Sequence, residues 1–204
     1  MPYSIFARLP DPATCSLITI ILTVSLIAFR SKKVFAKLIL HPYSVFHSKE
    51  YYRILTSDLV HNDYPHLLLN LGTFFLFGSN LEDILLKRSS YGSWHLIEIF
   101  IISQLFANTA YTLTNRNKFE NSSAGCSASV MGCLFALMIS DPYGTALSLY
   151  YWGGIANIYT GLVYILLLVY YSWRKGNDMV NHEIHFYGAI GGVLALMLVQ
   201  PPLF

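Results

Sequence analysis

Six runs of 17 residues or more contain no Lys, Arg, Asp or Glu, and they constrain the fold more than any other feature. These runs are Pro12–Phe29, Tyr64–Leu81, Ile99–Asn115, Asn121–Ser140, Pro142–Trp173 and Ile184–Phe204. About 20 consecutive apolar residues make a helix that crosses the hydrocarbon core of a bilayer. Only 12% of the residues are charged, too few to coat a soluble protein with six buried helices. The runs therefore predict an all-α membrane protein.

The runs predict six membrane-spanning helices in one domain over residues 1–204, at about 12–29, 64–81, 97–115, 124–140, 155–173 and 184–200. The first run lacks the flanking residues of a signal peptide, so we interpret it as a retained helix. The fifth is too long for one span, and Tyr150–Gly154 is interpreted as an interfacial aromatic belt before it. Residues 30–63 are expected to form a structured loop partly in the interface. Residues 82–98 are expected to form a shorter connection.

Charge and cysteine usage exclude several classes of protein. The net charge is +2 and the cations are dispersed at the span ends, so no nucleic-acid partner is expected. The three cysteines, Cys15, Cys126 and Cys133, all lie in apolar runs. They offer neither a disulfide framework nor paired zinc-ligand spacing. We expect no metal and no cofactor.

Polar side chains inside the spans gather at the starts of the second, fourth and sixth spans. They are His61, His66 and Asn70, then Gly125-Cys126-Ser127, then His182 and His185. Polar groups in a span are costly and usually face the interior of the bundle, where they tend to be functional. In a serial bundle with short connections these three spans begin on the same side of the membrane. The sequence therefore predicts one shared site at that end.

Small residues predict that the fourth and sixth spans pack together closely. The fourth has Ala128, Gly132 and Ala136 at four-residue intervals. The sixth has Gly188 and Gly192 at the same interval. Such small faces allow membrane helices to approach one another. Docking of these two faces would place Ser127 and His185 at a similar depth.

A serine hydroxyl beside an imidazole is the minimum for nucleophilic catalysis. The oxyanion formed when serine attacks an amide needs hydrogen-bond donors. The side chains of His66 and Asn70 and the backbone N–H of Ser127 are the candidates. Glu183 is two residues from His185 and points elsewhere on a helix, so a Ser/His dyad is predicted rather than a triad with a carboxylate.

Several short motifs occur together in the order and spacing of a known family. They are Tyr52-Arg53 in the first loop, His61, His66 and Asn70 as HxxxxHxxxN, Gly78 and Glu82 beyond them, Gly125-Cys126-Ser127 as GxS, and His185, Gly188 and Gly192 as HxxGxxxG. In this combination the chain resembles the rhomboid family of intramembrane serine proteases over most of its length. The resemblance implies a six-helix rhomboid-like bundle.

The resemblance also implies roles for these residues. Ser127 would be the nucleophile and His185 the general base, with His66, Asn70 and the Ser127 amide as the oxyanion hole. Arg53 and Glu82 would be structural, and His61, Gly125, Gly188 and Gly192 would support the site. The substrates would be transmembrane proteins that enter sideways from the lipid and are cleaved in or near their membrane helices.

Two departures from the family pattern leave an alternative open. Ala128 stands where the family usually has Gly, and Met131 stands where an aromatic residue commonly packs on the base. The alternative is a catalytically impaired relative that binds membrane-protein clients. A metal site built from His61, His66, His182 and His185 is a further class, but His182 and His185 do not have HExxH spacing. A transporter has no supporting broken-helix pair or inverted repeat.

The orientation of the chain is predicted differently by charge and by resemblance. The resemblance implies a bacterial inner-membrane protein whose site opens to the outer face. In that orientation the inner side holds only Arg8, Lys87 and Arg88 of the 13 cations, against the positive-inside tendency. Most of the excess comes from the structured first loop, so we follow the resemblance.

Overall fold

The computed structural model describes residues 12–149, 153–174 and 182–199. In chain order its elements are α1 (Pro12–Arg30), α2 (Lys32–Leu38), α3 (Pro42–His47), α4 (Arg53–Thr56), the 3₁₀ turn η1 (Ser57–Leu59), α5 (Tyr64–Arg88), α6 (Gly92–Asn115), α7 (Ser127–Ser140), β1 (Leu147–Leu149), β2 (Gly153–Ile155), α8 (Asn157–Arg174) and α9 (His182–Val199). The two strands form an antiparallel pair with Leu147 opposite Ile155. The predicted helical architecture is confirmed, except that the all-α prediction did not include this strand pair.

Each of the six predicted spans coincides with a helix, but their capacity to cross a membrane differs. Among the described residues, α1, α6 and α9 are long and apolar enough to do so. Helix α7 and the first part of α8, Asn157–Leu166, are shorter apolar helices. The count of six crossings stays a prediction. Of the expected aromatic belt, Tyr150–Trp152 lie outside the described residues, and Gly153 and Gly154 belong to β2.

The expected connection over residues 82–98 is wrong, because helix occupies most of it. Helix α5 continues to Arg88 and α6 begins at Gly92, which leaves only residues 89–91 between them. Charged residues fit at this end of α5, where Lys87 Nζ donates to Asp83 Oδ2 at 2.7 Å, one helical turn away. A charge-free run therefore marks the apolar part of a helix and not the residue at which the helix ends.

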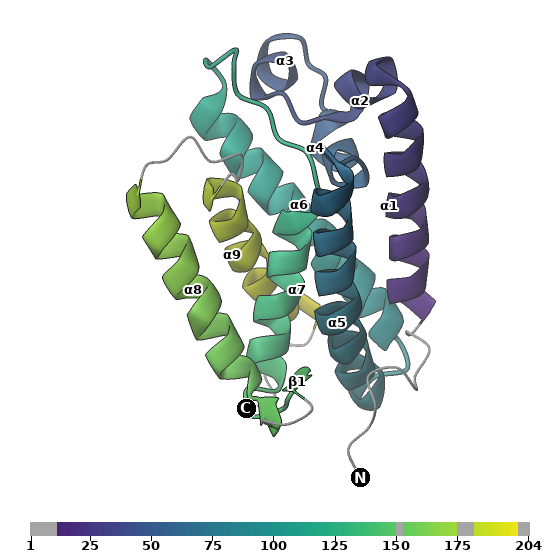
Figure 1. Cartoon of the computed structure of the whole chain (residues 1–204), viewed down its shortest axis with the longest axis vertical. Helices are drawn as coiled ribbons and strands as arrows, with labels where there is room; N and C mark the ends of the chain where they lie inside the picture. The colour runs from purple at the N-terminus through teal and green to yellow at the C-terminus, as the bar shows by residue number, and fades with distance from the viewer. Residues whose placement is uncertain (1–11, 150–152, 175–181, 200–204) are drawn as a thin grey trace.

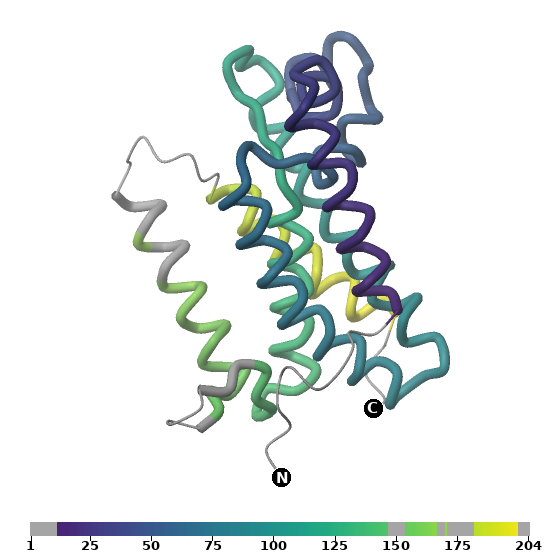
Figure 2. Tube along the Cα trace, turned by 45° about the vertical axis from the view of Figure 1, so that its right-hand side comes forward, coloured from purple at the N-terminus to yellow at the C-terminus, as the bar shows by residue number. Residues whose placement is uncertain are grey.

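Helix α7 lies at the centre of the bundle, in contact with α5, α6, α8 and α9. Figures 1 and 2 show α1 at one edge and α8 at the opposite edge. Helices α5, α7 and α9 begin at the same end of the molecule, beside the segment that contains α2, α3 and α4 (Figure 1). The predicted common location of these three helix starts is confirmed.

The expected structured segment between α1 and α5 is confirmed, and Arg53 holds part of it together. Its Nη1 donates to the carbonyl oxygens of Ala36 and Ile39, each at 2.8 Å. Its Nε also pairs with the carboxylate of Glu50. Arg53 thereby fixes the end of α2 against α4, as a structural residue would.

Glu82 is a fully buried carboxylate that joins three helices at the end opposite the helix starts. Its oxygens accept from the backbone N–H groups of Ala13 and Thr14, both at 2.9 Å. They also accept from the hydroxyls of Thr14 at 2.7 Å and Ser93 at 2.6 Å. The carboxylate therefore satisfies the first amides of α1, which have no acceptor within that helix, and links α1 and α6 to α5.

The predicted docking of small residues between α7 and α9 is confirmed. A Cβ atom added at Gly188 would overlap the carbonyl group of Ala128. One added at Gly192 would overlap the backbone of Gly132. Backbone meets backbone at both positions, so neither leaves room for a side chain. This close approach sets the relative position of the residues at the starts of the two helices.

Candidate active site

Ser127 and His185 meet at the common end of α7 and α9. The Oγ atom of Ser127 lies 2.7 Å from Nε2 of His185, within hydrogen-bond distance. Ser127 is the first residue of α7, and His185 lies in the first turn of α9. Both side chains are half-buried. The structure thus brings together a hydroxyl and an imidazole in the geometry that general-base activation of a nucleophile requires.

The side chains of His66 and Asn70 both face Gly125, two residues before Ser127. A Cβ atom added at Gly125 would lie 3.0 Å from Nε2 of His66 and 3.3 Å from Nδ2 of Asn70. Gly125 also has a φ of +112°, a conformation that side chains rarely permit. Glycine is therefore required here both for the backbone turn and for the approach of the two polar side chains.

Asn70 has an unsatisfied donor at this point. Its side chain is buried, and its Nδ2 atom has no hydrogen-bond partner among the described residues. Most buried polar atoms are paired, so an orphaned donor calls for an explanation. The backbone N–H of Ser127 is another donor, because the first amides of a helix have no acceptor within it. The amide of Asn70 and the imidazole of His66 therefore lie against Gly125, close in the chain to the backbone N–H and the hydroxyl of Ser127.

His61 connects α1 to the loop that precedes the nucleophile candidate. Its Nε2 atom accepts from the backbone N–H of Cys126 at 3.4 Å. The imidazole is fully buried, and this burial lowers the pKa of His61 to about 3. The ring is therefore neutral, and Nδ1 is left as its donor toward Ser25 Oγ at 3.0 Å. Ser25 donates in turn to the carbonyl of Leu59 at 2.9 Å.

Asp58 was not identified from the sequence, although it lies beside the predicted site. This side chain of η1 is 1% exposed, and burial raises the pKa of its carboxyl from 3.8 to about 7. Its Oδ2 atom accepts from the hydroxyl of Ser129 on α7 at 2.5 Å. Its Oδ1 atom accepts from Nδ2 of Asn108 on α6 at 3.4 Å.

Polar residues in the third predicted span gave a signal that could have led to this cluster. Gln104 and Asn108 lie one turn apart in a charge-free run. Nε2 of Gln104 donates to the carbonyl of Leu55 at 2.7 Å, and Nδ2 of Asn108 donates to that of Ile54 at 2.8 Å. The reasoning applied to polar residues in the other spans would have placed a buried polar contact here too.

Two further polar residues, His182 and Glu183, lie in the first turn of α9. Nδ2 of Asn115 donates to Oε2 of Glu183 at 3.4 Å, so this carboxylate points toward α6 and, as predicted, not toward the base. The ring centroids of His182 and His185 are 6.4 Å apart. Among the described residues, no group of three or more His, Cys, Asp or Glu side chains is gathered as a metal site would require.

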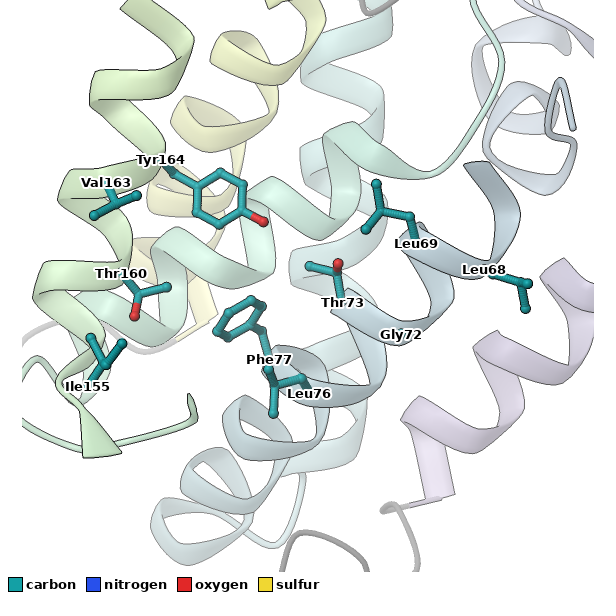
Figure 3. Close-up of a pocket in the computed structure, with 10 residues that line it drawn as sticks. All are labelled: Leu68, Leu69, Gly72, Thr73, Leu76, Phe77, Ile155, Thr160, Val163 and Tyr164. Atoms are coloured by element: carbon teal, nitrogen blue, oxygen red, sulfur yellow. The ribbon is translucent and has the colours of Figure 1, made fainter. Parts of the chain in front are cut away.

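A groove of about 470 Å³ lies between α5 and the β2–α8 segment. Figure 3 shows side chains of both elements around it, with the phenyl ring of Phe77 and the phenol of Tyr164 on opposite sides. Its lining is mainly apolar and comprises Leu68, Leu69, Gly72, Thr73, Leu76, Phe77, Ile155, Thr160, Val163 and Tyr164. On α5 the lining begins between His66 and Asn70, so the groove adjoins the oxyanion-hole candidates.

Comparison with protein families gives a match over most of the chain. A family model described as the Rhomboid domain matches residues 48–202. The matched region includes all the residues discussed above at the helix starts. A search of curated proteins finds no match.

Proposed function

The chain belongs to the rhomboid family, and from that premise we propose that it is a serine endopeptidase that hydrolyses peptide bonds in or near transmembrane segments. Members of this family are typically intramembrane proteases. The observation that carries the proposal for this chain is the 2.7 Å contact between Ser127 Oγ and His185 Nε2. The pair joins two helices whose glycines hold them in close contact.

In the proposed reaction, Nε2 of His185 takes the proton of the Ser127 hydroxyl as Oγ attacks the carbonyl carbon of the substrate. The resulting tetrahedral intermediate collapses to an acyl-enzyme when the amine leaves with a proton from His185. Water, activated by the same imidazole, then hydrolyses the ester and regenerates Ser127. No carboxylate is assigned to His185, so the catalytic unit is a dyad.

Three donors are proposed to stabilise the negative oxygen of the intermediate. They are Nδ2 of Asn70, the imidazole of His66 and the backbone N–H of Ser127. The unpartnered amide of Asn70 supports this assignment, because an oxyanion would supply the acceptor that the described residues do not provide. A donor that waits unpaired in the free enzyme stabilises the intermediate without first breaking another bond.

The proposed substrates are transmembrane proteins that enter laterally from the lipid, and the groove between α5 and α8 supports this route. Its apolar lining suits a segment that leaves hydrocarbon, and its α5 side reaches the turn that carries His66 and Asn70. In the described part of the chain, the main helix contacts of α8 are with α7 and α9. A displacement of α8 would therefore disturb few contacts in the bundle.

We further propose that the chain crosses the membrane six times, in a bacterial inner membrane, with the site near the outer face. The 25 residues of α5 would extend about 37 Å at 1.5 Å per residue, enough for one crossing. In this orientation the segment of α2, α3 and α4 lies at the outer surface, where its lysines reach water while its aromatic residues contact the interface.

Cleavage of a model transmembrane substrate by the purified chain tests the proposal. We expect wild type to cleave it and Ser127→Ala to be inactive, because alanine has no nucleophilic oxygen. Ser103→Ala is the matched control, since Ser103 is also buried and donates within its own helix, to Ile99 at 2.6 Å. Equal cleavage by wild type and Ser127→Ala contradicts the proposal. Substrate binding without any cleavage by wild type would favour the client-binding alternative.

A further inference from the structure

The carboxyl of Asp58 is buried beside the proposed site and takes no part in the dyad. It is 1% exposed and lies in η1, between α4 and α5. A buried carboxyl costs free energy unless it is hydrogen-bonded, and here the hydroxyl of Ser129 supplies a bond at 2.5 Å. Ser129 itself is fully buried. The pair joins η1 directly to the first turn of the helix that carries Ser127.

Ser129 lies on the opposite side of α7 from the hydroxyl of Ser127. The two residues are two positions apart, so at 100° per residue their side chains diverge by about 200° around the helix axis. Ser127 contacts His185 on α9, while Ser129 contacts Asp58 on η1. The first turn of α7 is therefore held from both sides, and its rotation is set by two hydrogen bonds.

The residue next to Asp58 holds the chain on the other side of the nucleophile. The carbonyl of Ser57 accepts from the backbone N–H of Gly125 at 3.0 Å. The hydroxyl of Ser57 accepts from Nδ2 of Asn108 at 3.0 Å, which ties this segment to α6. Residues 57 and 58 thus hold the chain both two residues before and two residues after Ser127.

We propose that Asp58 is a positioning residue, which acts through Ser129 to keep the Ser127 hydroxyl aligned with His185 and with the oxyanion-hole donors. The inference rests on the proposed protease function. Small misplacements of a reacting group reduce rates steeply, by about 100-fold for an error of 1 Å. A carboxyl acceptor with a short bond to a buried hydroxyl allows less rotation of α7 than an apolar contact would.

The test is the saturation kinetics of Ser127 labelling by a fluorophosphonate probe in the purified full-length chain, with rates corrected for the folded fraction. We expect Asp58→Ala and Ser129→Ala each to lower the maximal labelling rate about 10- to 100-fold, with little change in half-saturating probe concentration. Asp58→Asn retains an acceptor oxygen and should label within about threefold of wild type. Ser103→Ala, the matched buried serine, should label as wild type does.

The double variant Asp58→Ala/Ser129→Ala shows whether the two residues act as one unit. A shared function predicts that the double variant labels no more slowly than the slower single variant. Multiplying losses, or wild-type rates in the folded Asp58→Ala and Ser129→Ala proteins, would overturn the proposal. If Asp58→Ala does not fold, Ser129→Ala decides alone, since it removes a single hydroxyl. Failure of wild type to label at all would instead contradict the protease function itself.

Discussion

Asn70 combines a stability cost with a proposed catalytic benefit in one side chain. Its Nδ2 atom is buried without a partner among the described residues, and an unsatisfied buried donor costs about 1–3 kcal/mol. In the proposed mechanism the intermediate supplies the missing acceptor. Stability and activity should therefore respond in opposite directions when this amide is removed.

The variant Asn70→Leu separates these two effects. We expect the thermal unfolding midpoint to stay the same or rise, and the rate of substrate cleavage to fall by about 10²- to 10³-fold, the usual cost of one lost oxyanion-hole donor. Asn80→Leu is the control on the same helix, because Asn80 donates within that helix, to Leu76 at 2.7 Å. Equal losses of activity in both variants would show that Asn70 has no special role.

Gly125 is a second residue at which a small substitution should strongly reduce activity. The variant Gly125→Ala places a methyl group against the imidazole of His66 and strains a backbone with φ of +112°. We expect it to destabilise the protein by about 1–3 kcal/mol and to abolish cleavage. Gly72→Ala on α5 is the control, since a Cβ there meets no atom of the described residues within 4 Å. An active Gly125→Ala protein would contradict the site geometry described above.

The pairing of Ser127 with His185 could be predicted from sequence, whereas the pairing of Asp58 with Ser129 could not. Helical periodicity and the small residues of two spans fix the relative depth of their first turns, and depth was sufficient to bring Ser127 and His185 together. Asp58 lies in a segment without a long periodic pattern. Its proximity to Ser129 depends on how α4 and η1 fold back over α6, which no spacing in the sequence encodes.

At the scale of elements, the attachment of α1 depends on the carboxylate of Glu82. Replacement by Ala removes the acceptor of two backbone N–H groups and two hydroxyls. We expect Glu82→Ala to lower the free energy of unfolding by at least about 1.5–3 kcal/mol, the contribution of one hydrogen bond to a charged group. Denaturant or thermal unfolding in detergent measures this loss.

The neighbouring residue Asp83 provides the comparison for Glu82. It pairs with Lys87, and the side chains of Lys87 and Asp83 are 69% and 19% exposed. Ion pairs one turn apart on a helix contribute about 0.3–0.5 kcal/mol. Asp83→Asn should therefore have a much smaller effect than Glu82→Ala. Similar losses in the two variants would mean that α1 is held by apolar packing and not by the buried carboxylate.

Helix positions followed from charge-free runs, but helix ends did not. The run that ends at Leu81 predicted the apolar part of α5, whereas the helix continues to Arg88. In the fourth span, the predicted helix start at residue 124 shifts to Ser127, the first residue of α7. The left-handed conformation of Gly125 interrupts any regular helix before that residue. Local backbone conformation, and not hydropathy, determines where the nucleophile candidate lies in its helix.

At the scale of the whole molecule, Asp58 should make stability depend on pH. Its folded pKa, about 7, lies above the ordinary 3.8, so the folded state binds the proton more tightly than the unfolded state does. The contribution of Asp58 to the free energy of unfolding is therefore largest below about pH 4. It decreases as the pH rises from 4 to 7 and does not change further above pH 7. His61, with its pKa lowered to about 3, has the opposite dependence, since its stabilising effect is lost as pH falls below 6.5.

The difference between wild type and Asp58→Asn isolates the effect of Asp58. We expect the free energy of unfolding of wild type, relative to the variant, to decrease by up to about 4 kcal/mol between pH 4 and pH 7. A difference that is independent of pH would show that Asp58 is an ordinary carboxylate.

The proposed six crossings predict opposite locations for the two ends of the bundle. We expect Lys49→Cys, in the loop after α3, to react with an impermeant maleimide on intact cells, and Ser90→Cys, between α5 and α6, only after permeabilisation. Both positions are exposed. A Cys15→Ser background removes the one cysteine among the described residues that is not buried. Reaction of both positions from one side would refute the topology.

Labelling of Ser127 by a fluorophosphonate probe tests the central claim most directly, because it depends on the nucleophile, the base and the fold together. We predict that folded wild type is labelled at Ser127, identified by peptide mass spectrometry. The Ser127→Ala protein should not be labelled, and His185→Asn should be labelled only slowly. Labelling of Ser103→Ala should equal that of wild type. An unlabelled wild-type protein, or equal labelling of wild type and Ser127→Ala, would contradict the account.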